Sequence, residues 1–97
     1  MTMLSNRLPC IGDIWLIDFP YATPGNMTKI RPAIILKFLD DDRILVQKLT
    51  TRKRKGNKEF IHPKLKRKTY LSYEKAAVYD YSLIRYIGRV ENRRVKK

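Results

Sequence analysis

The stretch of sequence that decides the fold is PAIILKFLDDDRILVQKL, residues 32–49. Residues 32–38 form a nearly continuous apolar run, which predicts a strand buried on both faces. Three aspartates at residues 40–42 supply a polar turn, and residues 43–49 return as a second run of strand-forming residues. The segment therefore predicts an antiparallel β-hairpin.

Shorter segments on both sides of this hairpin also have the composition of strands. Residues 14–19 are rich in aromatic and β-branched side chains and are stopped by Pro20. Residues 21–29 contain proline, glycine and asparagine and predict a loop. The remaining expected elements are a weak strand over residues 58–62, strands over 69–73 and 76–79, and one turn of helix at 82–84 that leads into 85–90.

Many short strands and little helix favour a mainly β fold. A small closed or half-open barrel is expected, because rolling a sheet removes its exposed edges. A chain of 97 residues has room for one domain with a single core. We therefore expect one domain over residues 1–97, with an N-terminal arm at 1–10 and a basic tail at 91–97.

The charge is strongly positive, with 22 Lys and Arg against nine Asp and Glu and a formal net charge of +13. Such a surface makes nucleic acid the first partner to consider. The cations are concentrated in the middle of the chain, at Lys48, Arg52, Lys53, Arg54, Lys55, Lys58, Lys64, Lys66, Arg67 and Lys68. The alternative interpretation of this run is a solvated loop without a partner.

The sequence lacks the marks of export, membranes and metal sites. Cys10 is the only cysteine, so no internal disulfide can form, and no Cys/His cluster has metal-ligand spacing. Residues 1–9 lack the apolar core of a signal peptide, and no apolar stretch approaches the roughly 18 residues that span a bilayer. A protein of the reducing cytoplasm, without a metal or a cofactor, is expected.

Three motifs occur in order along the chain: GDIWLIDFP at residues 12–20, RPAIIL at 31–36 and ILVQKLTT at 44–51. KTYLSYEK at 68–75 and SLIRYIGRV at 82–90 follow them. This ordered set resembles the MazF/PemK (Kid) family of toxin ribonucleases. Its members share a GDI opening with a DF-P end, an Arg-Pro entry to an aliphatic strand, and a strand ending in Thr-Ser or Thr-Thr.

The resemblance implies an SH3-like small β-barrel of the MazF/PemK (CcdB-like) type, usually a homodimer. Many relatives continue into a long C-terminal helix, which is not expected in a chain that stops at Lys97. The implied function is that of a type II toxin. It is a metal-independent, sequence-specific endoribonuclease that cleaves single-stranded messenger RNA, stops translation and growth, and binds an acidic antitoxin protein.

The resemblance also implies roles for individual residues. Arg31 matches the family's catalytic arginine and Thr50 its catalytic threonine. Thr51 occupies the neighbouring hydroxyl position, and Asp18 matches an acidic residue that supports the architecture near the site. The residues expected to bind RNA are Phe19, Tyr21, Lys29, Lys48, Arg52, Lys53, Arg54 and Lys55. Phe19 and Tyr21 have a second interpretation, in which they pack over the end of the barrel.

The chemistry of Arg31 and Thr50 can be judged without the family. Metal-free RNA cleavage uses the substrate's 2′-hydroxyl as nucleophile, so the protein must orient the phosphate and stabilise growing negative charge. A guanidinium holds two phosphate oxygens at once, and a threonine hydroxyl donates a further hydrogen bond. The predicted hairpin brings the start of one strand beside the end of the other, which predicts that Arg31 and Thr50 are neighbours.

Two alternatives to a ribonuclease remain. In one, the same barrel is a non-catalytic nucleic-acid-binding module, a degenerate toxin relative or an RNA or DNA adaptor, that uses residues 52–58 as an electrostatic clamp. Arg31 would then be a cation at a strand end and Thr50 a residue chosen for its β propensity. In the other, the chain is a structural protein of the ribosome. His62, the only histidine, is the only ordinary general-base candidate near neutral pH, but it matches no catalytic histidine of the family, so a surface role is expected.

Overall fold

Six β-strands and one turn of 3₁₀-helix form the described part of the molecule. The computed structural model describes residues 8–20 and 28–90. The elements are β1 (Asp13–Pro20), β2 (Thr28–Phe38), β3 (Arg43–Thr50), β4 (Lys58–Phe60), β5 (Thr69–Tyr79), η1 (Asp80–Ser82) and β6 (Leu83–Arg89). No α-helix occurs within those two ranges.

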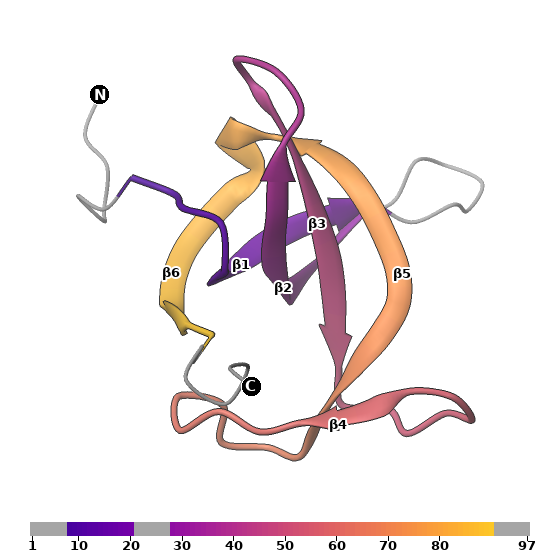
Figure 1. The fold of residues 1–97 in the computed structure, drawn as a ribbon. Coiled ribbons are helices and arrows are strands. Elements are labelled where there is room, and N and C mark those ends of the chain that lie inside the picture. Colours follow the sequence, from indigo (N-terminus) through magenta and orange to yellow (C-terminus); the bar gives the residue numbers. More distant parts are fainter. Residues whose placement is uncertain (1–7, 21–27, 91–97) are drawn as a thin grey trace, which may run out of the picture.

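The strands form one antiparallel sheet in the order β4-β5-β3-β2-β1-β6. Figure 1 shows that the sheet curls strongly into a half-barrel. Register shifts interrupt the β1–β6, β2–β3 and β3–β5 ladders. Such irregularities bend a strand and increase its twist, which explains the curl. The prediction of a mainly β, half-open barrel is confirmed.

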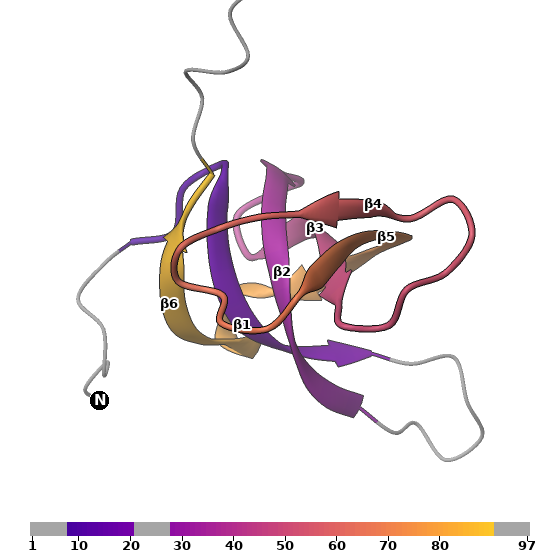
Figure 2. The ribbon, with the colours of Figure 1, turned by 90° about the horizontal axis from the view of Figure 1, so that it is seen from below.

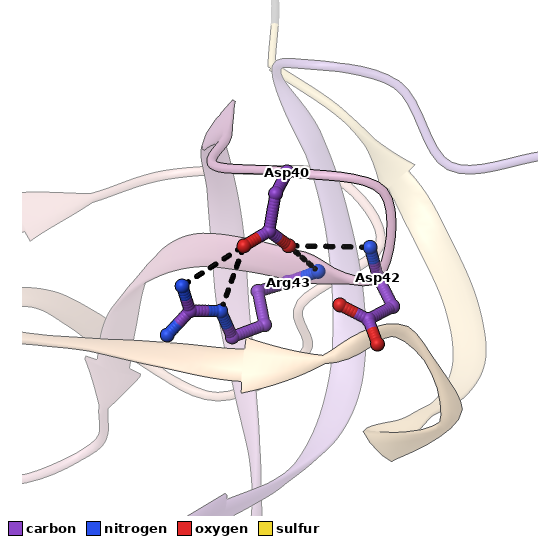
Figure 3. A network of polar contacts seen from close by, with 3 residues as sticks. All are labelled: Asp40, Asp42 and Arg43. Atoms are coloured by element: carbon purple, nitrogen blue, oxygen red, sulfur yellow. Dashed lines mark hydrogen bonds and ion pairs between the residues drawn. The ribbon is translucent and has the colours of Figure 1, made fainter.

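The predicted hairpin is formed by β2 and β3, and a single carboxylate organises its turn. Asp40 Oδ1 accepts hydrogen bonds from the backbone N–H groups of Asp42 (3.3 Å) and Arg43 (3.0 Å). Its Oδ2 accepts two more from the Arg43 guanidinium, from Nε at 3.0 Å and Nη2 at 2.9 Å (Figure 3). The aspartates of the turn therefore act through local hydrogen bonds, as short polar side chains do in turns.

Apolar side chains are buried on both faces of the sheet. The first core cluster consists of Trp15, Ile17, Phe19, Ala33, Ile35, Ile44, Val46 and Val78. The second core cluster consists of Ile14, Ile34 and Leu49. Within β2, Ala33 and Ile35 belong to the first cluster and Ile34 to the second, as the alternation of a strand requires. The prediction that residues 32–38 are buried on both faces is confirmed for this central part of β2.

The second core cluster is covered by β4 and the segment that follows it. Phe60 and Leu65 pack against the cluster, and His62 between them is only 8% exposed. The Nδ1 atom of His62 accepts a hydrogen bond from the backbone N–H of Lys64 (3.1 Å), so Nε2 carries the proton and donates to the carbonyl oxygen of Arg89 (2.7 Å). The expected surface role of His62 is wrong, because the imidazole ties this covering segment to β6.

The GDI opening of the first motif has a structural explanation. Gly12 has a φ of +92°, a conformation that favours glycine. The fully buried carboxylate of Asp13 accepts hydrogen bonds from the backbone N–H of Cys10 (2.8 Å) and from Trp15 Nε1 (3.3 Å). It also lies 3.6 Å from Arg89 Nη1. These contacts fix the entry of β1 against β6.

Several predicted boundaries differ from the structure. β2 begins at Thr28, within the predicted loop 21–29, because the start of β2 pairs with the end of β1. The predicted strands 69–73 and 76–79 are one continuous strand, β5, and β4 ends at Phe60. The predicted turn of helix at 82–84 lies earlier, at η1.

Candidate functional site

β2 and β3 part at the end of their hairpin opposite the aspartate turn. Their ladder ends with the pair Ala33–Lys48. Beyond this pair β2 continues alongside β1, with Arg31 opposite Ile17, whereas β3 continues alongside β5, with Thr50 opposite Tyr70. Figure 2 shows the end of the β1–β2 pair and the loop between β3 and β4 projecting on the same side of the molecule.

Two cavities open where the strands part. The first cavity, of about 580 Å³, is lined by Lys29, Arg31, Lys48, Thr50, Arg52, Arg54, Lys55, Asn57, Ser72, Tyr73 and Glu74. The second cavity, of about 330 Å³, is lined by Ile30, Arg31, Pro32, Leu49, Thr50, Thr51, Arg52, Arg67 and Thr69. Arg31, Thr50 and Arg52 line both, so the two cavities meet at these residues.

Arg31 presents a positive charge at this junction. Directly opposed residues of an antiparallel pair point to the same face, so Arg31 shares the face of Ile17 and of the first core cluster. Arg31 is half-buried, and its Nη1 donates to the carbonyl oxygen of Ile30 (3.0 Å). No carboxylate of residues 8–20 or 28–90 forms an ion pair with Arg31. Its remaining N–H groups are therefore available to an anion in the cavities.

Thr50 ends β3 and is held by the loop that follows. Its Oγ1 accepts a hydrogen bond from the backbone N–H of Arg52 (3.1 Å). Because this oxygen acts as the acceptor, the hydroxyl hydrogen remains available to donate into the cavity. Thr51 is exposed and lines only the second cavity. The predicted proximity of Arg31 and Thr50 is thus found as a shared lining of both cavities rather than as a paired position in the ladder.

Lys48 marks the boundary between the first core cluster and the first cavity. Its side chain is 12% exposed, and its Nζ forms an ion pair with Glu74. The same ammonium lies 5.9 Å from the ring centroid of Phe19. Burial of the lysine stem against apolar neighbours while the charged end faces a polar space is common for this side chain.

The first cavity is strongly cationic. Among the described residues, six Lys and Arg side chains line it, against the single carboxylate of Glu74. Three of the six are on the exposed loop after β3: Arg52, Arg54 and Lys55. Lys53, between them, lines neither cavity. A concave surface with charges of one sign concentrates an oppositely charged ligand.

Three other residues predicted for the site have different positions. Asp18 is exposed, lines neither cavity and lies on the face of β1 opposite to that of Ile17, so it does not approach Arg31. Phe19 is 3% exposed and packs in the first core cluster, which leaves no free face for stacking on a base. Tyr21 lies outside the described residues.

Several residues of the cavities were missed by the sequence analysis: Asn57, Arg67, Thr69, Ser72, Tyr73 and Glu74. Most of them lie on or just before β5, whose pairing with β3 places Leu71 opposite Leu49. The KTYLSYEK motif contains four of these residues and could have pointed to them, but no site residue was predicted from it.

Comparisons with known proteins give no match: no protein-family model matches the chain, and no curated protein matches it significantly. Among residues 8–20 and 28–90, no helix has the length and apolar character needed to cross a membrane. The same residues contain no group of three or more His, Cys, Asp and Glu side chains positioned to hold a metal ion.

Proposed function

We propose that this protein is a metal-independent endoribonuclease that cleaves single-stranded RNA. The observation that carries the proposal is the shared lining of both cavities by the Arg31 guanidinium and the Thr50 hydroxyl. A phosphodiester held at this junction receives two parallel hydrogen bonds from the guanidinium and one from the hydroxyl. These donors stabilise the additional negative charge that develops on the phosphoryl oxygens in the transition state.

The reaction needs no nucleophile from the protein. The 2′-oxygen of the ribose attacks the adjacent phosphorus, the O2′–P bond forms and the P–O5′ bond breaks. The 2′-hydroxyl proton passes to a base, and the leaving 5′-oxygen takes a proton from water. The products are a 2′,3′-cyclic phosphate and a 5′-hydroxyl. Glu74 is the one carboxylate in the described part of the chain that lines either cavity, so it is the candidate base.

The biological role that we propose is that of a type II toxin with a MazF/PemK-type SH3-like barrel. The curled antiparallel sheet and the ordered sequence motifs support this assignment. The toxin would act as a homodimer in the cytoplasm, cleave messenger RNA and be inhibited by an acidic antitoxin. A net charge of +13 favours fast capture of both RNA and an acidic protein.

The distribution of charge further supports a polyanionic substrate. Four of the nine acidic residues, Asp40, Asp41, Asp42 and Asp80, lie at the turn end of the β2–β3 hairpin, where the backbone N–H of Asp80 donates to the carbonyl oxygen of Asp42 (2.9 Å). Arg31 and Thr50 are at the opposite end of the same strands. Because the acidic residues lie at one end and the cationic cavities at the other, the electrostatic field turns the cavities toward an approaching RNA strand.

A second candidate function is a binding module without catalysis. The observation in its favour is that no histidine lines either cavity, and both ring nitrogens of His62 are engaged by backbone groups elsewhere. A cationic groove without an efficient base would bind RNA and leave it intact. In that case, neutralising Arg52 and Arg54 would weaken binding more than Arg31→Ala does, and affinity would fall steeply with salt.

The discriminating experiment incubates the purified protein with single-stranded RNA in excess chelator, beside Arg31→Ala. We expect the wild type to produce fragments that end in a cyclic phosphate, identified by mass spectrometry, and the variant to leave the RNA intact. Equal cutting by both proteins would assign the activity to another site or to a contaminant. Binding without cutting by the wild type would support the second candidate function.

A further inference from the structure

We propose that the RNA strand crosses the junction of the two cavities, with a subsite for a neighbouring nucleotide on each side of the reacting phosphate. In the first cavity Tyr73 provides a stacking surface for a base. In the second cavity Arg67 holds the next phosphate group. This inference rests on the proposed function and assigns two residues to binding of the strand.

The second cavity has the character of a nucleotide subsite. Of residues 8–20 and 28–90, three arginines line it, Arg31, Arg52 and Arg67, and no carboxylate does. Its volume of about 330 Å³ lies at the lower end of the roughly 300–1,000 Å³ typical of small-molecule pockets. Apolar side chains from β2 and β3 line the same space. A cationic rim over an apolar surface suits a ligand with both a phosphate and a flat base.

Arg67 is the cation of the second cavity that does not belong to the first. Its backbone is fixed, because the buried Thr69 donates a hydrogen bond from Oγ1 to the carbonyl oxygen of Arg67 (2.8 Å). Arg67 forms no ion pair with a carboxylate of residues 8–20 or 28–90, whereas Nζ of the neighbouring Lys68 lies 4.0 Å from Glu59. Arg67 is exposed and belongs to the segment before β5, and it lines the same cavity as Ile30 and Pro32.

Tyr73 is placed for stacking in the first cavity. Tyr73 is 72% exposed, so its ring is accessible to a base. The ring lies against Gly56, where an added Cβ would be 3.0 Å from Cε2 of Tyr73. Gly56 has a φ of +91°, so the loop turns sharply at the point where it meets the ring. Stacking of bases on exposed aromatic side chains is the usual way in which proteins bind single-stranded RNA.

The junction explains why both subsites belong to one strand. Because Arg31 and Thr50 line both cavities, a phosphodiester bound by them has one neighbouring nucleotide on the Tyr73 side and the other on the Arg67 side. The Glu74 carboxylate lines only the first cavity, so it does not repel a phosphate in the second.

The test measures binding separately from cleavage. The probe is a fluorescent, random-sequence, short 2′-O-methyl RNA, which lacks the attacking hydroxyl and cannot be cut. Its affinity is measured by anisotropy over a range of salt concentrations for the wild type, Arg67→Ala, Tyr73→Ala, Tyr73→Phe and Lys66→Ala. Lys66 is the matched control, because it is an exposed cation beside Arg67 that lines neither cavity.

Each variant has a distinct expected result. Arg67→Ala weakens binding about tenfold and lowers the slope of log affinity against log salt by about 0.7, the value for one phosphate contact in single strands. Tyr73→Ala weakens binding about tenfold with an unchanged slope, and Tyr73→Phe binds like the wild type. Lys66→Ala has a smaller effect on both affinity and slope than Arg67→Ala.

Two outcomes would overturn the inference, and a third would contradict the proposed function. Equal effects of Arg67→Ala and Lys66→Ala would show that Arg67 acts only through the overall positive charge and not as a phosphate subsite. An unchanged affinity for Tyr73→Ala would show that no base stacks on Tyr73. Circular dichroism establishes that each variant is folded, so a loss of binding by a folded variant is attributed to a lost contact with the RNA. Failure of the wild type to bind the uncut probe would contradict the proposed function itself, which distinguishes the two failures.

Discussion

Arg31 and Thr50 lie on facing strands, each two residues beyond the last pair of the β2–β3 ladder, Ala33–Lys48. Since side chains alternate along a strand, this equal offset keeps both residues on the face that Ala33 and Lys48 share. The strands no longer pair at this point, so cavities open on either side of the two residues. The proposed activity depends on these two hydrogen-bond donors, which lie where the two strands separate.

Replacement of Arg31 should abolish most cleavage without unfolding the protein. Loss of a donor that stabilises the transition-state oxyanion lowers the rate by about 10²- to 10³-fold, so Arg31→Ala should show at least this decrease. Arg31→Lys keeps the charge but not the bidentate geometry and should recover only part of the rate. Because Arg31 is half-exposed and its guanidinium bonds to the carbonyl oxygen of the neighbouring residue, the free energy of unfolding should change by less than about 1 kcal/mol.

The measurements are single-turnover cleavage of a labelled RNA and urea denaturation. Arg85→Ala is the matched control, since Arg85 is an exposed strand arginine of β6 that lines neither cavity. If Arg85→Ala and Arg31→Ala slow cleavage equally, the charge of the whole protein rather than the site governs the rate.

Replacement of Thr50 tests the hydroxyl with little change of shape. Thr50→Val removes the acceptor of the Arg52 N–H bond and the donor to the phosphate. A hydrogen bond to a charged group contributes about 1.5–3 kcal/mol, so the cleavage rate should fall by at least about tenfold. Thr50→Ser keeps the hydroxyl and should stay within a few-fold of the wild type. A serine variant as slow as the valine variant would show that the methyl group, not the hydroxyl, is what matters.

The hairpin and its turn could be predicted because their signals are local. The apolar run of residues 32–38 and the aspartates at 40–42 determine a strand and a turn without help from the rest of the chain. Antiparallel pairing about that turn was also sufficient to place Arg31 near Thr50. The parting of the strands was not predictable, because it results from the pairing of β2 with β1 and of β3 with β5.

The residues that were missed depend on contacts distant in sequence. Glu74 and Lys75 interrupt the apolar pattern, so β5 was predicted as two strands with a break at these residues. In the structure Glu74 is paired with Lys48, and Lys75 lies opposite Gln47, so the strand continues through both. His62 likewise gave no sequence signal for burial, since its position is determined by Arg89.

The Asp40–Arg43 ion pair predicts a pH dependence of stability. Hydrogen bonds from the Arg43 guanidinium, together with the backbone N–H of Asp42, lower the pKa of Asp40 below its ordinary value of 3.8. A carboxyl whose pKa is lower in the folded state stabilises the fold above the unfolded-state pKa, and this contribution disappears as the pH falls through the folded-state value. Asp40→Asn should therefore be less stable than the wild type at neutral pH, and the difference should shrink below about pH 4.

Urea denaturation of both proteins from neutral to strongly acidic pH checks this expectation. Added salt should reduce the difference, because the pair is exposed. Asp41→Asn is the control, since Asp41 belongs to the same turn but forms none of the hydrogen bonds of Figure 3. If the loss of stability at neutral pH persists unchanged in acid, the effect comes from the asparagine side chain and not from the lost charge.

The contact between Gly88 and His62 predicts a coupled effect on stability. A Cβ at residue 88 would lie 2.7 Å from Cε1 of His62, closer than atoms can approach. His62 is held by Lys64 and Arg89 through both ring nitrogens, so it cannot move without losing a hydrogen bond. Gly88→Ala should therefore destabilise the protein by about 1–3 kcal/mol.

The same substitution should cost much less in a His62→Ala background, where the ring that clashes is absent. A double-mutant cycle by urea denaturation measures this coupling, which contacting residues show and distant residues do not. Neither residue lines either of the two cavities, so cleavage by each folded variant should match the wild type. An equal cost of Gly88→Ala in both backgrounds would mean that the glycine is needed for the backbone of β6 and not for the imidazole packed against it.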